Sequence, residues 1–316
     1  MGVDASTFVT YTAIGNREDL EDVIYRIDPT DTWFVSNATK GKAKAVNHEW
    51  QTQALAAAAA NAVLEGDDAT TDAVTPTVRL GNICQISDKV ARVSGTQEAV
   101  EHAGRDSEMN YQKTLKGLEL KRDLELIIVG SNTAKNAGAI GTARLTASIL
   151  SWIKTNNSSG ASPGAAPATA DGAATRTDGV QRAFTEALLK PVLQSIWTNG
   201  GDPGVILVGG FNKQQFSTFT GRATPQENAT SKKIVNSVDV YEGDFGTMKV
   251  IADRFMRARD CLILDMDYWA IDYLRNMVSI DLAKTGDSER RQILTEYCLV
   301  SRNEKASGIV ADLTTT

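Results

Sequence analysis

The chain has 316 residues, of which 42% are hydrophobic, and it carries a net charge of −6 at neutral pH. This length suffices for one elaborated domain or for two, and the apolar content is enough to build a core. The longest apolar runs fall far short of the roughly 18 residues that a membrane helix needs. The first residues also lack the basic and apolar regions of a secretory signal, so we expect a folded, soluble protein.

The positions of the cysteines and lysines argue against disulfide-stabilised, zinc-binding and sequence-specific nucleic-acid-binding proteins. Cys84, Cys261 and Cys298 lie far apart without a CxxC pair, which argues against a disulfide framework and against a zinc site. The only locally basic tract spans residues 40–44. A protein that grips nucleic acid concentrates positive charge on one face, so direct sequence-specific binding is not expected.

The pattern of residues 1–46 predicts an extended arm that contains one short helix. Asn16 can cap this helix, and Asp28-Pro29 ends it. Its apolar face would consist of Leu20, Val23, Ile24 and Ile27. The lysines of residues 40–44 are typical of a mobile arm that touches acidic neighbours.

Residues 47–96 predict two long arms of a projecting hairpin. Turn signals are few, and the main one is Gly66-Asp67-Asp68. The alanine run of residues 56–60 could be locally helical. Because an isolated hairpin is marginal in water, we expect this hairpin to lie on another subunit.

Residues 97–129 predict one long, highly charged helix of roughly 50 Å. Its expected buried stripe consists of apolar and small residues three or four apart: Val100, Ala103, Ser107, Tyr111, Leu115 and Leu118. The stripe widens after Leu120, which predicts that the C-terminal end enters a core. Gly104 and Gly117 are positions at which the helix can bend or break.

The second half of the chain predicts a small α/β lobe followed by an antiparallel sheet. Residues 156–179 are rich in small residues and predict a flexible surface loop. A helix is expected from Asp178, interrupted at Pro191 and ended at Asn199, before a buried strand at Val205–Val208. Five segments then alternate as strands: residues 238–241, 248–252, 262–266, 278–282 and 293–300.

Few residues suggest catalysis. His48 and His102 are the only histidines, and neither lies beside a nucleophile motif such as GxSxG. No GxxxxGK[ST] phosphate loop occurs. Asp265 and Asp267 could point to one face at a strand end and suit a divalent cation, although solvated carboxylates at a sheet edge are the commoner case. We therefore expect no catalytic, cofactor-binding or metal-binding residues.

The sequence resembles a major head protein family of the tailed bacteriophages. The resemblance rests on the order and spacing of short motifs along nearly the whole chain: residues 12–32 (TAIGNREDLEDVIYRIDPTDT), 48–54 (HEWQTQA), 92–105 (RVSGTQEAVEHAGR), 119–123 (ELKRD), 240–246 (VYEGDFG), 282–287 (LAKTGD) and 303–308 (NEKASG). Trp33 departs from the pattern, because a proline is expected there before the aromatic residue.

The resemblance implies the α+β Johnson fold of tailed-phage capsid proteins. Its expected parts are an N-terminal arm (residues 1–46), an extended loop (47–96), a peripheral domain with a spine helix (97–144), an axial α/β domain (145–234), and a peripheral sheet with the C-terminal segment (235–316). The implied function is self-assembly into hexamers and pentamers of an icosahedral head around double-stranded DNA. The chain would be assembled in the host cytoplasm and would reside in the virion.

The resemblance also implies partners and contacts. Besides copies of itself, the expected partners are a portal protein, a scaffolding protein and a decoration protein. The scaffolding protein is expected to be a separate chain, because the sequence begins directly at the arm. No membrane partner is expected. Motif position and expected exposure select the following residues for contacts between subunits: Trp33, Glu49, Trp50, Gln51, Arg79, Arg92 and Arg105.

Two other functions remain open at the level of sequence. A nanocompartment shell of the same fold would enclose cargo enzymes in place of a genome. An enzyme built on the α/β lobe would use Asp265 with Asp267, or Cys261, but the missing base and phosphate motifs disfavour it.

Overall fold

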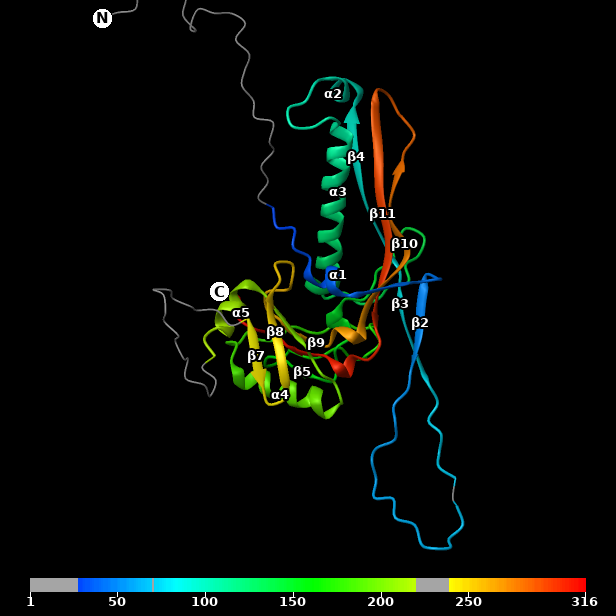
Figure 1. The fold of residues 1–316 in the computed structure, drawn as a ribbon, viewed down its shortest axis with the longest axis vertical. Helices are drawn as coiled ribbons and strands as arrows, with labels where there is room; N and C mark the ends of the chain where they lie inside the picture. The colour runs from blue at the N-terminus through cyan, green and yellow to red at the C-terminus, as the bar shows by residue number, and fades with distance from the viewer. Residues whose placement is uncertain (1–27, 70, 220–238) are drawn as a thin grey trace, which may run out of the picture.

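A computed structural model describes residues 28–69, 71–219 and 239–316. Figure 1 shows a tall upper part with a long helix beside strands, a compact lobe below it, and a ribbon that projects past the lobe. The helix predicted near residues 16–27 lies outside the described residues. No helix within the described ranges is long and apolar enough to cross a membrane.

The predicted single helix over residues 97–129 is wrong in its extent. The structure has a short helix α2 (Gly95–Ala99), a connection, the helix α3 (Glu108–Glu125), and a π-helical continuation η1 (Leu126–Gly130). Each helix has its own cap, because the Ser94 hydroxyl accepts from the Gln97 amide and the Ser107 hydroxyl accepts from the Asn110 amide. Gly104 lies between them with φ +72°, a conformation that no helix contains.

The buried face of α3 differs from the predicted stripe. Val100 is 55% exposed, and Leu115 and Leu118 are only half-buried. The fully buried apolar residues of this helix and its continuation are Met109, Leu120, Leu124, Ile128 and Val129. The expectation that the C-terminal end enters a core is therefore confirmed, although Leu126 stays 49% exposed.

A four-stranded sheet packs against α3 in the upper part (Figure 1). Its order is β1 (Thr39–Lys42), β10 (Trp269–Asp281), β11 (Ser288–Ser301) and β4 (Gln85–Ser94). The first pair is parallel and the others are antiparallel. The Lys89 ammonium on β4 lies 2.7 Å from the Asp123 carboxylate on α3, and the apolar contact comes from Leu120, Leu124, Ile293 and Tyr297.

The lobe contains a six-stranded sheet covered by two helices. Its order is β5 (Asn157–Ser158), β12 (Gly308–Val310), β9 (Cys261–Leu264), β6 (Val205–Val208), β8 (Gly246–Ala252) and β7 (Val240–Gly243). The buried strand predicted at Val205–Val208 is β6, and both its faces are covered. Val205 and Leu207 join the core shared with α3, whereas Ile206 and Val208 pack with α4 (Glu186–Thr198) and α5 (Gly210–Phe216).

The sheet predicted from residues 235–316 is therefore divided between the two parts. Only β10 and β11 lie beside α3, whereas β7, β8, β9 and β12 join β6 in the lobe. Apolar alternation identified these strands, but it carries no signal for which distant strand each one pairs with. Four short helices complete the described chain: α1 (Trp33–Asn37), η2 (Ile149–Ser151), η3 (Met266–Tyr268) and η4 (Glu304–Ala306).

Two local predictions about the lobe are wrong. The helix expected from Asp178 begins at Glu186 and runs through Pro191 to Thr198, where Gly200 with φ +86° follows its end. Residues 156–179 do not form a freely exposed loop. Arg176 is 3% exposed and Asn156 is 1% exposed. Asn156 donates to the Lys305 carbonyl, and the Arg176 guanidinium lies 3.9 Å from the Asp312 carboxylate.

The ribbon consists of β2 (Asn47–Thr52), β3 (Val78–Ile83) and the chain between them. The two strands are antiparallel, with Trp50 opposite Leu80. The returning arm of the predicted hairpin ends at Ile83, because β4 pairs with β11 instead. The alanine run is not helical, and the described residues between the strands contain only a turn at Glu65-Gly66.

Candidate assembly surfaces

The distal ribbon, residues 53–77, makes the most exposed surface of the described chain. Every described residue in it is exposed, including Leu55 at 97%, Leu64 at 80% and Val74 at 89%. Figure 1 shows it reaching well beyond the lobe. An extended segment with exposed aliphatic side chains and no packed face gains little stability alone, so its sequence favours burial on a partner.

The distal ribbon is acidic, and the arm next to it is basic. Glu65, Asp67, Asp68 and Asp72 are its only charged residues. Lys40 and Lys42 are exposed on β1, which forms one edge of the four-stranded sheet. The surface of one chain thus carries two complementary charged segments. The outer edge of β1, which pairs with no strand of the described residues, can accept an extended strand.

The base of the ribbon is fastened to its own chain. The Trp50 indole Nε1 donates to the Ser301 carbonyl at 2.9 Å, and its ring lies 5.5 Å from the Trp152 ring between centroids. His48 Nε2 lies 2.8 Å from a carboxylate oxygen of Asp272 on β10. Trp50 therefore anchors the ribbon within the subunit.

The other predicted contact residues are spread over the surface. Glu49, Gln51 and Arg79 are exposed on the ribbon, where Arg79 Nε lies 3.6 Å from Glu49 Oε2 and opposes Gln51 across the strands. Arg92 is exposed on β4, and its Nε donates to the Ser288 hydroxyl at 3.0 Å. The guanidinium of Arg105 pairs with Glu108, and Trp33 is half-buried against the main core. The structure thus brings three of the seven together.

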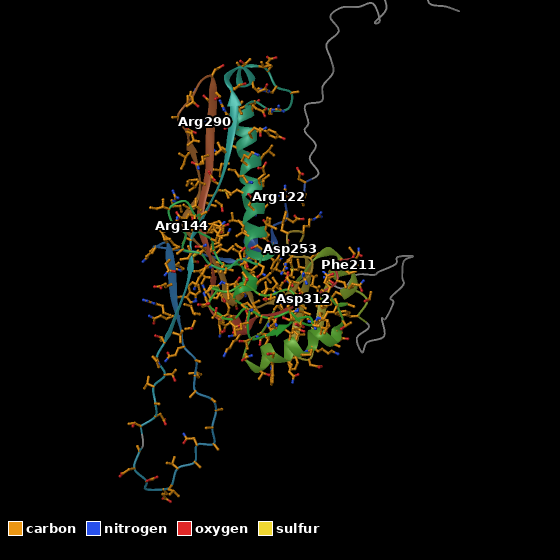
Figure 2. The ribbon with its side chains drawn as sticks, turned by 180° about the vertical axis from the view of Figure 1, so that it is seen from behind. Arg122, Arg144, Phe211, Asp253, Arg290 and Asp312 are labelled. Carbon is orange, nitrogen blue, oxygen red and sulfur yellow. The ribbon has the colours of Figure 1, made fainter. Side chains whose placement is uncertain are left out.

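A buried carboxylate that the sequence analysis missed attaches the arm to α3. Both oxygens of Glu125 accept backbone amides at the start of α1, from Phe34 at 2.6 Å and from Val35 at 2.8 Å. Burial, together with the neighbouring Asp253, raises the pKa of Glu125 to about 8. Figure 2 shows Asp253 near the lower end of α3. A charged residue between Leu124 and Leu126 was the available signal in the sequence.

This carboxyl group predicts a pH dependence. Its folded-state pKa of about 8 exceeds the ordinary value of 4.5, so neutral Glu125 stabilises the folded chain most at low pH, and that contribution is lost as the pH rises from 4.5 to about 8. We expect Glu125→Gln to flatten the fall in urea midpoint over this window. Identical slopes for wild type and variant would contradict the assignment.

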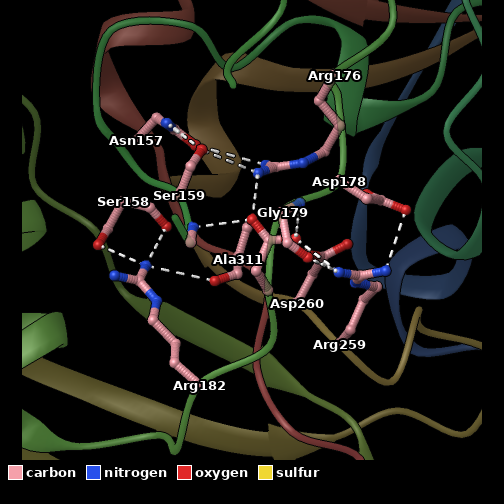
Figure 3. Close-up of polar contacts among 12 residues, drawn as sticks. Asn157, Ser158, Ser159, Arg176, Asp178, Gly179, Arg182, Arg259, Asp260 and Ala311 are labelled. Carbon is pink, nitrogen blue, oxygen red and sulfur yellow. Dashed lines mark hydrogen bonds and ion pairs between the residues drawn. The ribbon is translucent and has the colours of Figure 1, made fainter. Parts of the chain in front are cut away.

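A second missed feature is a buried ionic cluster in the lobe (Figure 3). The carboxylate of Asp312 accepts from the amides of Gly160 and Gly179 and from Arg259, each at 2.8 Å. Its backbone has φ +60°. Around it lie four arginines and two more aspartates: Arg176, Arg182, Arg257, Arg259, Asp178 and Asp260.

The cluster fastens the C-terminal segment to residues 157–182. The Arg182 guanidinium donates to carbonyls of Ser158 and Ala311, and Arg176 donates to the Ser159 hydroxyl at 3.2 Å. The Arg257 hydrogen bond lowers the pKa of Asp178, whereas burial raises the pKa of Asp260. Arginine and aspartate spacing along the chain gives no hint of this cluster, because its charged members come from three distant segments, residues 176–182, residues 257–260 and Asp312.

The residues considered for catalysis, Asp265 and Cys261, have structural roles, one as a helix cap and the other in the core. The Asp265 carboxylate accepts from the Asp267 amide at 3.2 Å and so caps η3. Cys261 is fully buried in β9, and burial raises its thiol pKa far above the ordinary range. Within residues 28–69, 71–219 and 239–316, no three His, Cys, Asp or Glu side chains are grouped as metal ligands.

Comparison with known proteins identifies the family. The family model described as SU10 major capsid protein matches residues 5–314. The major capsid protein of Escherichia phage Phieco32 is 28% identical, with 96% of each chain covered. The cyanophage A-1(L) capsid structure has a TM-score of 0.67 at 12% identity, covering 95% of this chain and 97% of that one.

A shell of another kind has the same fold. The encapsulin complex of Synechococcus elongatus has a TM-score of 0.59 at 10% identity, covering 95% of this chain and 93% of that one. The structural likenesses establish the Johnson fold of phage capsid proteins. Together with the family match, they show that this chain belongs to the SU10 major capsid protein family and is a phage major capsid protein.

Proposed function

We propose that copies of this chain form hexamers and pentamers of an icosahedral head that encloses the double-stranded DNA of a tailed phage. The observation that carries the proposal is the distal ribbon, in which every described residue is exposed and the aliphatic side chains are not covered by any other described part of the chain. A second copy would cover it through a repeated heterologous contact, the type of contact that closes into rings. The net charge of −6 suits a shell that holds DNA without gripping it.

The same proposal gives the chain no enzymatic role. It acts in the virion after assembly in the host cytoplasm, alongside a portal protein, a scaffolding protein and a decoration protein. Strand pairing supports a revised division of the fold. The peripheral part combines α3 with β4, β10 and β11, and the axial part combines residues 156–216 with β7, β8, β9 and β12.

Ribbon truncation tests the proposed function. Replacing residues 55–75 by a short Gly/Ser linker removes side chains that are exposed at every described position, so folding should be unchanged while particle formation is lost. Circular dichroism and urea unfolding measure folding, and electron microscopy of the purified protein measures particle formation. Particles of normal number and heat resistance would overturn the proposed role of the ribbon.

Charge complementarity supports a contact between the ribbon tip of one subunit and β1 of its neighbour. Asp67→Lys combined with Asp68→Lys should therefore reduce particle yield at least tenfold, and each tenfold change corresponds to about 1.4 kcal/mol. Adding Lys40→Glu with Lys42→Glu to this variant should restore the yield. Sedimentation velocity quantifies the yield. Failure of the second pair to restore assembly, with both variants folded, would reject this placement.

A nanocompartment shell is the second candidate, and the encapsulin likeness supports it. The two functions differ in contents, because a head encloses DNA and a nanocompartment encloses protein. Nuclease-protected DNA in particles from infected cells would support the head. Particles that hold only a cargo protein would support the alternative.

A further inference from the structure

Two of the three cysteines meet where the ribbon leaves the four-stranded sheet. The ladder between β4 and β11 ends with Gln85 opposite Tyr297, and the next step of this register brings Cys84 opposite Cys298. Both residues are fully buried. They share a small core with Ala43, Ala270 and Val300, against which Trp50 packs.

Cys84 lies at the point where the ribbon joins the four-stranded sheet, which we call the ribbon pivot. It is the single residue between β3, which pairs with β2, and β4, which pairs with β11. Its amide donates to the Val46 carbonyl at 2.7 Å, and its thiol lies 3.5 Å from the Ala45 carbonyl. A covalent bond at this point would fix the direction in which the ribbon leaves the subunit.

The geometry of opposed strands suits a disulfide. Directly opposed residues of antiparallel strands have Cα atoms about 4.5–5.5 Å apart, and disulfides span Cα distances of about 4.4–6.8 Å. The two thiols also differ in chemistry. The hydrogen bond from Cys298 lowers the pKa of Cys84, whereas that hydrogen bond and burial raise the pKa of Cys298. This difference favours Cys84 as the attacking thiolate of the pair.

We propose that Cys84 and Cys298 are a latent disulfide site, which a peroxide closes to link the ribbon pivot to the central strand β11. The Cys84 thiolate attacks hydrogen peroxide, forming a sulfenic acid and releasing hydroxide. The Cys298 sulfur then attacks that sulfur, and its proton leaves with the hydroxyl group as water. The two thiols lose two electrons, and one peroxide is reduced.

The proposal rests on the subunit alone and does not require the ribbon to bind a neighbour. Its consequence is a pivot that stiffens on oxidation and loosens on reduction. Cys261 supplies an internal control, because it is equally buried but lies in β9 of the six-stranded sheet.

Peptide mapping tests the bond itself. The full chain is treated with hydrogen peroxide, alkylated in denaturant and digested. We expect a linked peptide that joins Cys84 to Cys298, a mass lower by about 2 Da and a single alkylated cysteine. Cys261→Ser should leave the linked peptide unchanged, whereas Cys84→Ser and Cys298→Ser should abolish it. Wild-type chain that keeps three alkylatable thiols, or that links Cys261 as readily, would overturn the proposal.

Hydrogen exchange tests the consequence. Amides of β2 and β3 should exchange at least tenfold more slowly in the oxidised chain than in the reduced chain, and a dithiol reductant should reverse the effect. Cys298→Ser should show no peroxide-dependent change in these strands. A linked peptide without any change in exchange would reject the role of the bond at the pivot.

Discussion

Asp312→Ala is expected to lower the free energy of unfolding by about 3–5 kcal/mol, the usual cost of breaking a buried ion pair. The variant would leave Arg259 and the amides of Gly160 and Gly179 without their shared acceptor. Alanine is also strained at the φ of +60° that aspartate adopts here. Urea unfolding of the soluble chain measures the loss.

Two control variants separate the effect of the Asp312 charge from the general effect of a substitution on stability. Asp312→Asn keeps the shape and tolerates the same backbone conformation, so it should cost less than the alanine variant. Arg79→Ala removes a side chain that is 70% exposed and should change stability by less than about 1 kcal/mol. An Asp312→Ala chain as stable as the Arg79 variant would show that the cluster does not fasten the C-terminal segment.

Leu124→Asp is expected to prevent folding or to cost more than about 4 kcal/mol, because it places an unpaired charge in the main core. Leu124 is 1% exposed and packs among residues of α3, the four-stranded sheet and the lobe. The matched control is Leu115→Asp on the same helix. Leu115 is only half-buried in the subunit, so its variant should stay folded.

The yield of soluble protein and its circular dichroism distinguish the two leucine variants. If Leu124→Asp were soluble and folded while Leu115→Asp were not, the buried face of α3 would be the one predicted from sequence. Equal damage from both would indicate that the whole helix is buried within the subunit.

Sequence reasoning identified features that depend on neighbouring residues. The strand at Val205–Val208 was visible as a short apolar run, and the glycines after Asn199 marked the end of α4. Ser94 and Ser107 were equally local signals for two separate helices, yet the charged periodicity across them led to one long helix. The two serine caps, and not the charge periodicity, determine where α2 and α3 begin.

Features that depend on distant residues could not be predicted in the same way. The division of strands between the two sheets, the Asp312 cluster and the meeting of Cys84 with Cys298 all join segments far apart in the chain. The family resemblance supplied the architecture, but only the strand register showed which strand belongs to which sheet. Trp50 illustrates the limit, since nothing in its motif indicated that its indole would donate to the Ser301 carbonyl of its own subunit.

The central claim is that this chain assembles with itself into a closed shell. The most direct measurement is negative-stain electron microscopy combined with analytical ultracentrifugation of the chain, alone and with virion-derived partner proteins. We expect closed shells or capsomer rings under at least one of these conditions. A stable monomer under both conditions would contradict it.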